Sequence, residues 1–125
     1  MLASTNILII IASSNFRDEE YQEPRKILES AGANITVASK TKNTSTGTKG
    51  FKVTPDISID KIKIPDYQAI IFVGGAGSRE YFNDPNIHNI AKEANKNGIL
   101  IGAICIAPVI LANAGLLRGK RATVF

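Results

Sequence analysis

Residues 99–110 read ILIGAICIAPVI, and this stretch decides the fold. Its first half, Ile99 to Ile104, is apolar and rich in β-branched residues, which is typical of a strand buried on both faces of a parallel sheet. Pro108 suits the first turn of a helix, and we expect that helix to run to about Ala114. Cys105 therefore falls at an abrupt junction between a buried strand and a helix.

The same alternation of strand and helix continues on the N-terminal side of this stretch. Short apolar runs predict buried strands at residues 6–12, 34–39 and 69–73. Apolar residues at helical spacing predict a helix over 86–97 and another between these strands. Alternating strands and helices favour a single α/β domain, residues 1–125, with a doubly wound parallel sheet sandwiched by helices.

Three weaker expectations concern local structure. Asp18 is expected to cap the first helix, and Pro24, which suits only a first turn, places the start of that helix near Glu20. The polar residues 40–50 are interpreted as a surface excursion with short strands beside it. Residues 122–125 (ATVF) are expected to start one more strand, and the pattern breaks off in its middle at Phe125.

Composition excludes several classes of protein. No dense basic block is interleaved with aromatic residues, although the net charge is +4, so nucleic-acid binding is not expected. One cysteine excludes a disulfide scaffold and favours the cytoplasm. One cysteine and one histidine, His88, cannot assemble a metal site, and neither a phosphate-binding loop nor a dinucleotide fingerprint occurs. We therefore expect no metal, no cofactor and no membrane segment.

Cys105 is the first candidate for chemistry. A helix that begins just after it would direct its N-terminus at the sulfur, which favours the nucleophilic thiolate. The alternative is a buried, inert cysteine that acts as a small apolar residue. The strand-to-helix junction favours the reactive thiol.

Ligands of doubly wound sheets bind outside the carboxyl ends of the strands, where Glu20 and the loop after residue 73 are expected to join Cys105. The carboxyl of Glu20 could exchange a proton with the thiol, or serve only the helix dipole. The glycines Gly74 and Gly75 allow close approach of backbone N–H groups, and with the N–H of Ile106 they could bind an oxyanion.

Together these pieces resemble the ThiJ/PfpI (DJ-one) superfamily. The matching stretches are FRDEEYQEP (16–24), DYQAIIFVGG (66–75), AICIAP (103–108) and GLLRGKRAT (115–123). The resemblance implies a flavodoxin-like sandwich similar to class I glutamine amidotransferase domains. It makes Cys105 the nucleophile, Glu20 its acidic partner, and Gly75 and Ile106 the donors to the oxyanion. It also implies a homodimer or higher oligomer, and a complementary C-terminal segment after Phe125.

Two positions depart from the family pattern. Protease-like members carry histidine directly after the nucleophile, where this chain has Ile106. Members like DJ-one carry a further histidine at a position that aligns with Phe125. A cysteine–histidine dyad within this chain is therefore not expected, and the base would have to be Glu20, a later segment or a partner subunit.

The leading hypothesis is a cysteine-dependent hydrolase or lyase of glyoxalase or deglycase type, which acts on a small carbonyl compound. The alternatives are a redox-sensing or chaperone-like stress protein, an intracellular cysteine peptidase of PfpI type, and an inactive structural member. Each assigns a different reactivity to Cys105, from a nucleophile to an inert thiol.

Overall fold

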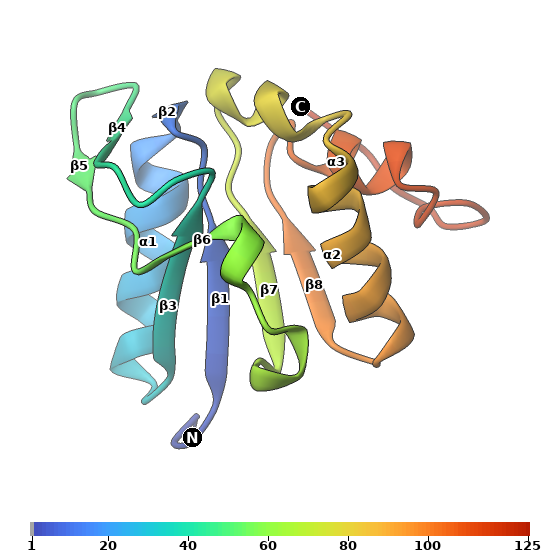
Figure 1. Ribbon diagram of the computed structural model, residues 1–125, viewed down its shortest axis with the longest axis horizontal. Helices are drawn as coiled ribbons and strands as arrows, with labels where there is room; N and C mark the ends of the chain where they lie inside the picture. The colour runs from blue at the N-terminus through green and yellow to red at the C-terminus, as the bar shows by residue number, and fades with distance from the viewer. Residues whose placement is uncertain (1) are drawn as a thin grey trace.

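The computed structural model describes residues 2–125 as a parallel sheet between helices (Figure 1). The sheet has five strands in the order β6-β3-β1-β7-β8, and every neighbouring pair is parallel. Its strands are β1 (Asn6–Ile10), β3 (Asn34–Ser39), β6 (Ile57–Ser58), β7 (Ala69–Phe72) and β8 (Leu100–Ala103). The predicted α/β class and parallel sheet are confirmed.

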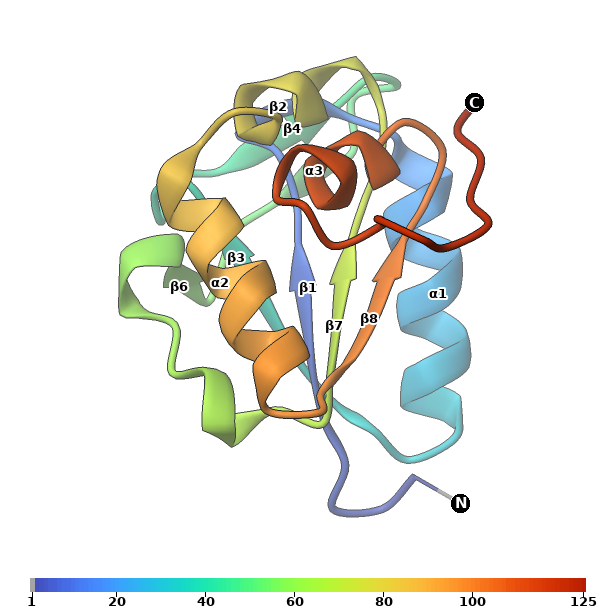
Figure 2. The same cartoon turned by 90° about the vertical axis from the view of Figure 1, so that its right-hand side faces the viewer.

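Helices cover both faces of this sheet, as Figure 2 shows from the side. Helix α1 (Asp18–Ser30) lies on one face, and α2 (Pro85–Lys96) and α3 (Pro108–Asn113) lie on the other. Three short 3-10 helices complete the connections, namely η1 (Ile59–Lys61), η2 (Ile64–Asp66) and η3 (Ala76–Tyr81).

The apolar composition of β1 follows from this sandwich. Leu8 and Ile10 belong to the core shared with α2 and α3, whereas Ile7 and Ile9 belong to the core on the side of α1. Successive side chains of a strand point to opposite faces, so a central strand covered on both sides has no position for a polar residue.

A second, smaller sheet lies beside the start of α1. It consists of β2 (Ser14–Phe16), β4 (Ser45–Gly47) and β5 (Lys52–Val53), in that order. The β4–β5 hairpin (residues 45–53), within the stretch interpreted as a surface excursion, is thus part of this smaller sheet, and β2 is the strand beside it. The pairing joins segments about thirty residues apart, which local sequence patterns do not reveal.

Helix α1 starts earlier than expected. It begins at Asp18, its N-cap is Arg17, and no side chain caps it. Pro24 lies inside the helix, although proline cannot donate the helical hydrogen bond to the carbonyl of Glu20. The cap expected at Asp18 and the helix start expected near Glu20 are therefore both wrong. Contacts with other elements hold the first turn of the helix in place.

Residues 121–125 form no strand, contrary to expectation. They make one backbone hydrogen bond to the main fold, from the N–H of Phe125 to the carbonyl of Cys105 (3.0 Å). A single hydrogen bond does not make a strand pairing, and these residues are exposed.

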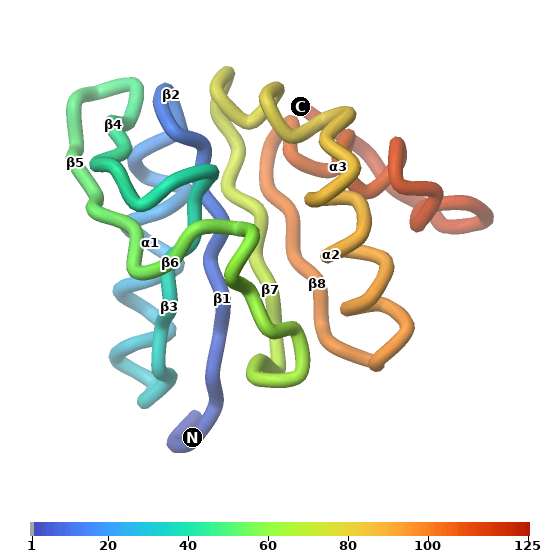
Figure 3. The backbone as a smooth tube through the Cα atoms, in the orientation of Figure 1, coloured from blue at the N-terminus to red at the C-terminus, as the bar shows by residue number. Residues whose placement is uncertain are grey.

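Figure 3 shows that the chain runs from the amino ends of the strands to their carboxyl ends, which it reaches at residue 125. Within residues 2–125, no helix is long and apolar enough to span a bilayer.

Candidate functional site

Cys105 occupies the sharp turn between β8 and α3. Its φ is +62°, one of only three positive values among the non-glycine residues described. Hydrogen bonds fix the backbone on both sides, from Ile104 N–H to Phe72 O (3.2 Å) and from Ala107 N–H to Ile104 O (2.9 Å). A strained backbone that persists between such anchors is characteristic of functional sites.

Cys105 as a whole residue is neither sealed in the core nor fully exposed. The residue is a free cysteine of intermediate exposure. It lines an open cavity of about 480 Å³ together with Ala103, Ile104, Pro108 and residues 123–125. A small molecule therefore has access to this residue.

Glu20 approaches the Cys105 turn from α1, by way of Gly74 and not through the lining of that cavity. Its Oε1 accepts a hydrogen bond from the N–H of Gly74, at the end of β7 (3.0 Å). Its second oxygen, Oε2, has no protein hydrogen-bond partner among residues 2–125. The carbonyl of Gly74 accepts from the N–H of Arg17 (3.0 Å), so the start of α1 is joined to the end of β7 by two bonds.

Glycine at position 74 is what lets these groups meet. A Cβ added there would lie 2.4 Å from Glu20 Oε1, 2.7 Å from Ile104 O and 2.8 Å from the Cβ of Cys105. Both side chains therefore lie within a few ångströms of one point. Gly75 follows with a φ of +96°, and a Cβ on it would collide with the backbone N of Arg17.

Three backbone amides were expected to serve an oxyanion, and their situations differ. The N–H of Gly74 is occupied by Glu20. Within residues 2–125, the N–H groups of Gly75 and Ile106 donate to no protein acceptor. These two amides therefore keep their donor capacity for a partner from outside the described fold.

Asp18, in the same helix turn as Glu20, bonds the β4–β5 hairpin, a role that the sequence does not predict. Its carboxylate is 4% exposed and accepts from the N–H groups of Lys49 (2.9 Å) and Phe51 (3.0 Å). Burial raises the pKa of Asp18, but these hydrogen bonds outweigh it, and the net pKa lies below the ordinary value. The glycines of the polar stretch were the available signal, since Gly47 makes room for this carboxylate.

Two other acidic residues, Glu80 and Glu19, bind partners within the fold. Glu80 accepts from the N–H (2.6 Å) and the Oγ (2.8 Å) of Ser13, which joins η3 to the end of β1. The pKa of Glu19 is lowered to about 2, most by a hydrogen bond with its own backbone and next by one from the side chain of Lys49. The Glu19 side chain is 42% exposed and its partners Arg17 and Lys49 are more exposed still, so these ion pairs add little to stability.

A metal centre finds no support in the described part of the chain. No group of three or more histidine, cysteine, aspartate or glutamate side chains gathers between residues 2 and 125. The Nε2 of His88 lies 2.7 Å from the carbonyl of Phe82, on the side of α2, where it joins two segments of the fold.

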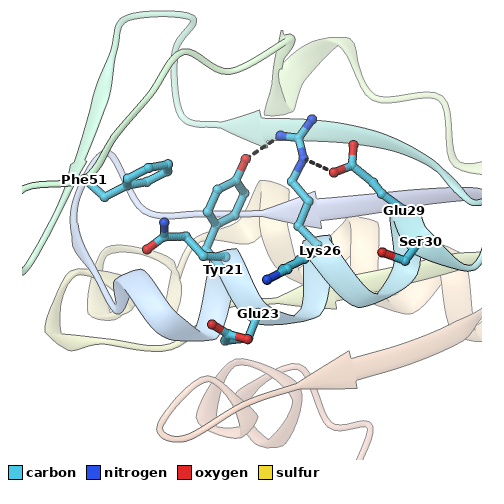
Figure 4. Close-up of a pocket in the computed structure, with 8 residues that line it drawn as sticks. Tyr21, Glu23, Lys26, Glu29, Ser30 and Phe51 are labelled. Atoms are coloured by element: carbon cyan, nitrogen blue, oxygen red, sulfur yellow. Dashed lines mark hydrogen bonds and ion pairs between the residues drawn. The ribbon is translucent and has the colours of Figure 1, made fainter.

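A larger open cavity, of about 720 Å³, lies along α1 (Figure 4). Tyr21, Glu29 and Phe51 line it, and the guanidinium of Arg25 bonds both the Tyr21 hydroxyl and the Glu29 carboxylate (3.3 Å). None of the expected site residues lines this cavity. This larger cavity is therefore separate from the place where Glu20 and Cys105 approach each other at Gly74.

Comparisons with known proteins place the chain among related sequences. The sequence model of the DJ-1/PfpI family matches residues 5–125. An uncharacterised protein of Methanocaldococcus jannaschii is 41% identical over 99% of this chain, which spans 61% of the length of that relative. A protein of Pyrococcus horikoshii named a deglycase is 31% identical over 93% of the chain, which spans 70% of that protein.

Solved structures show the same fold. The crystal structure of a ThiJ/PfpI domain protein from Brachyspira murdochii superposes with a TM-score of 0.94 at 32% identity. The match covers 100% of this chain and 72% of that one. The expected flavodoxin-like architecture is thereby confirmed.

Proposed function

The chain belongs to the DJ-1/PfpI family, and we propose that it is a cysteine-dependent hydrolase or lyase of glyoxalase or deglycase type. Cys105 is the nucleophile, and Glu20 transfers protons beside it. The observation that carries the proposal is the convergence of both residues on Gly74, with Cys105 on a strained turn. The Pyrococcus relative named a deglycase supports the class of reaction.

The first step is addition of the Cys105 thiolate to the aldehyde carbon of a small oxoaldehyde. A carbon–sulfur bond forms, and the π electrons of the carbonyl move to its oxygen. The N–H groups of Gly75 and Ile106 have no protein acceptor within residues 2–125, and they hold that oxygen as negative charge develops. The oxygen then takes a proton, which gives a hemithioacetal.

Glu20 carries out the second step. Its Oε1 is held by the N–H of Gly74, which leaves Oε2 for the substrate. The carboxylate removes the proton from the former aldehyde carbon, which gives an enediol, and returns it to the former ketone carbon. The hydroxyl on the former aldehyde carbon gives up its proton and the former ketone oxygen gains one, so a 2-hydroxy acid thioester of Cys105 results. Water then cleaves the thioester and restores the thiol. The net change for methylglyoxal is addition of one water to give lactate, with no external oxidant or reductant.

Lactate formed from methylglyoxal by the purified protein tests this proposal. Replacement of Cys105 by alanine or serine should reduce the rate by at least about a thousandfold, because the covalent route is closed. Equal rates for the wild type and the Cys105→Ala variant would refute the proposal.

A second candidate is a redox sensor or a chaperone-like stress protein. The specific observation is that Cys105 is free and accessible, beside an acidic group. Mild peroxide followed by intact mass should then add oxygen atoms to the wild type and none to Cys105→Ala. A thiol that stays unmodified would count against a sensor.

A peptidase of PfpI type has less support. Ile106 stands directly after the nucleophile, and the histidine of the chain, His88, bonds the carbonyl of Phe82 on the face covered by α2. We retain as predictions a cytoplasmic location and a homodimer or higher oligomer. Size-exclusion chromatography with light scattering would test the oligomer.

A further inference from the structure

The first turn of α1 carries a second acidic residue, Asp18, two positions before Glu20. Its carboxylate is enclosed by the tip of the β4–β5 hairpin, where Oδ1 accepts from the N–H of Lys49 (2.9 Å) and Oδ2 from the N–H of Phe51 (3.0 Å). Both oxygens are therefore held by backbone donors, and the side chain is 4% exposed. Such a carboxylate has a fixed position, unlike an ordinary acidic residue at a helix start.

The hairpin is shaped to receive this group. A Cβ at Gly47 would lie 2.5 Å from Asp18 Oδ1 and 2.6 Å from its Cγ. The N–H of Thr48 donates to the carbonyl of Phe16 (2.9 Å), which fastens the same tip to the residues before α1. The hairpin and the start of α1 thus form one unit.

On its other side the same turn is fastened to β7. The N–H of Arg17 donates to Gly74 O, and the N–H of Gly74 donates to Glu20 Oε1, both at 3.0 Å. No side chain caps the helix at Arg17, so contacts with other elements must fix where this turn lies.

We propose that Asp18 is a positioning residue, which clamps the first turn of α1 between the hairpin and β7 so that the Glu20 carboxylate stays on Gly74 beside Cys105. What Glu20 then does for the thiol rests on the proposed function. The positioning itself can be measured without any turnover.

The direct measurement is hydrogen exchange of the Gly74 amide in ¹⁵N-labelled protein. Asp18→Asn replaces one accepting oxygen by an amide NH2 group that cannot accept, so one hairpin N–H loses its partner. We expect Gly74 exchange to rise about tenfold, as it should in Glu20→Ala, which removes the acceptor, while amides of β1 and β7 in the core keep their rates. A Gly74 rate unchanged in Asp18→Asn but raised in Glu20→Ala would overturn the inference.

A matched control separates positioning from general destabilisation. Asp56 Oδ2 accepts from the N–H of Val37 (2.8 Å), a bond of the same kind on a strand that does not carry the site. Asp56→Asn should leave Gly74 exchange unchanged, and an equal rise in both variants would overturn the inference. If Asp18→Asn does not fold, Gly47→Ala displaces the same carboxylate from the hairpin side and should give the same rise.

A second readout follows the thiol. The pH dependence of Cys105 alkylation by iodoacetamide should change in the same direction in Asp18→Asn and Glu20→Gln. Asp18→Asn should add nothing in the Glu20→Gln background, because both act on one arrangement. Additive effects would overturn the inference. An alkylation profile unchanged in Glu20→Gln would contradict the proposed role of Glu20 in the function, while the Gly74 exchange still decides the positioning.

Discussion

The carboxylate of Glu20 accepts a hydrogen bond from the N–H of Gly74 at 3.0 Å, which joins the first helix to the end of a central strand. Gly74 is also the residue against which the Cβ of Cys105 packs. An acid from one end of the chain and a thiol from the other are thus brought together by a residue that has no side chain.

The packing at Gly74 predicts that an added methyl group is not tolerated there. In Gly74→Ala the new Cβ would lie 2.4 Å from Glu20 Oε1 and 2.7 Å from the carbonyl of Ile104, and backbone cannot move away cheaply. We expect the free energy of unfolding to fall by about 3 kcal/mol and lactate formation to be lost. Urea denaturation and the lactate assay measure these effects.

Gly102→Ala is the control for this substitution. A Cβ at Gly102 would meet only the Ile71 side chain, at 3.8 Å, which is an ordinary contact. Its stability and activity should stay close to those of the wild type. If Gly74→Ala behaved like Gly102→Ala, the close approach described above would be wrong.

Glu20→Gln should separate chemistry from folding. The amide oxygen can still accept from the N–H of Gly74, so the melting temperature should change by only a few degrees. Lactate formation should fall by about a hundredfold, because an amide cannot carry the proton. Glu23→Gln, three residues further along α1 and exposed, should leave the rate unchanged. A Glu20→Gln variant with full activity would exclude Glu20 as the proton carrier.

Asp18 predicts how stability responds to acid. Its pKa in the folded protein lies below the value of 3.8 for a free side chain, so its contribution is fully present above about pH 4 and is lost as the pH falls through the folded pKa. At pH 7, Asp18→Asn should lower the free energy of unfolding by about 2 kcal/mol. The difference in unfolding free energy between the variant and the wild type should be smaller at pH 2.

Urea denaturation of both proteins at the two pH values checks this sign. Glu19, whose pKa is lowered to about 2, titrates over the same range. Its ion pairs are exposed, so Glu19→Gln should change stability much less than Asp18→Asn does. A difference in unfolding free energy between Asp18→Asn and the wild type that was larger at pH 2 than at pH 7 would contradict the environment described for Asp18.

The central strand β1 should tolerate little loss of volume. Leu8 is fully buried between β1 and the helices α2 and α3. Leu8→Ala should cost about 3 kcal/mol of unfolding free energy, since the surrounding core cannot close the cavity. Ile27→Ala, at a side chain that is 65% exposed on α1, should cost well under 1 kcal/mol. Thermal denaturation of both variants gives the comparison.

The sequence predicted best where one segment determines its own structure. Residues 99–110 contain both the buried strand and the proline at the helix start, so the turn at Cys105 could be located from that stretch alone. The meeting of Glu20 with the end of β7 was predicted from topology, because parallel strands bring their carboxyl ends to one edge.

The errors all depend on partners distant in the sequence. Asp18 was expected to cap a helix, but its partners are Lys49 and Phe51, about thirty residues away. Pro24 was expected in a first turn, but the bonds between Arg17, Glu20 and Gly74 hold the helix in place before it. Residues 122–125 have the composition of a strand, yet composition cannot provide the neighbouring strand that a ladder requires.

Intact mass of the protein after rapid quenching with methylglyoxal tests the central claim most directly. The claim predicts a single adduct, located by peptide mapping at Cys105, which persists longer in Glu20→Gln and is absent in Cys105→Ser. Adducts found only on arginine and lysine side chains, with lactate still formed by Cys105→Ser, would contradict it.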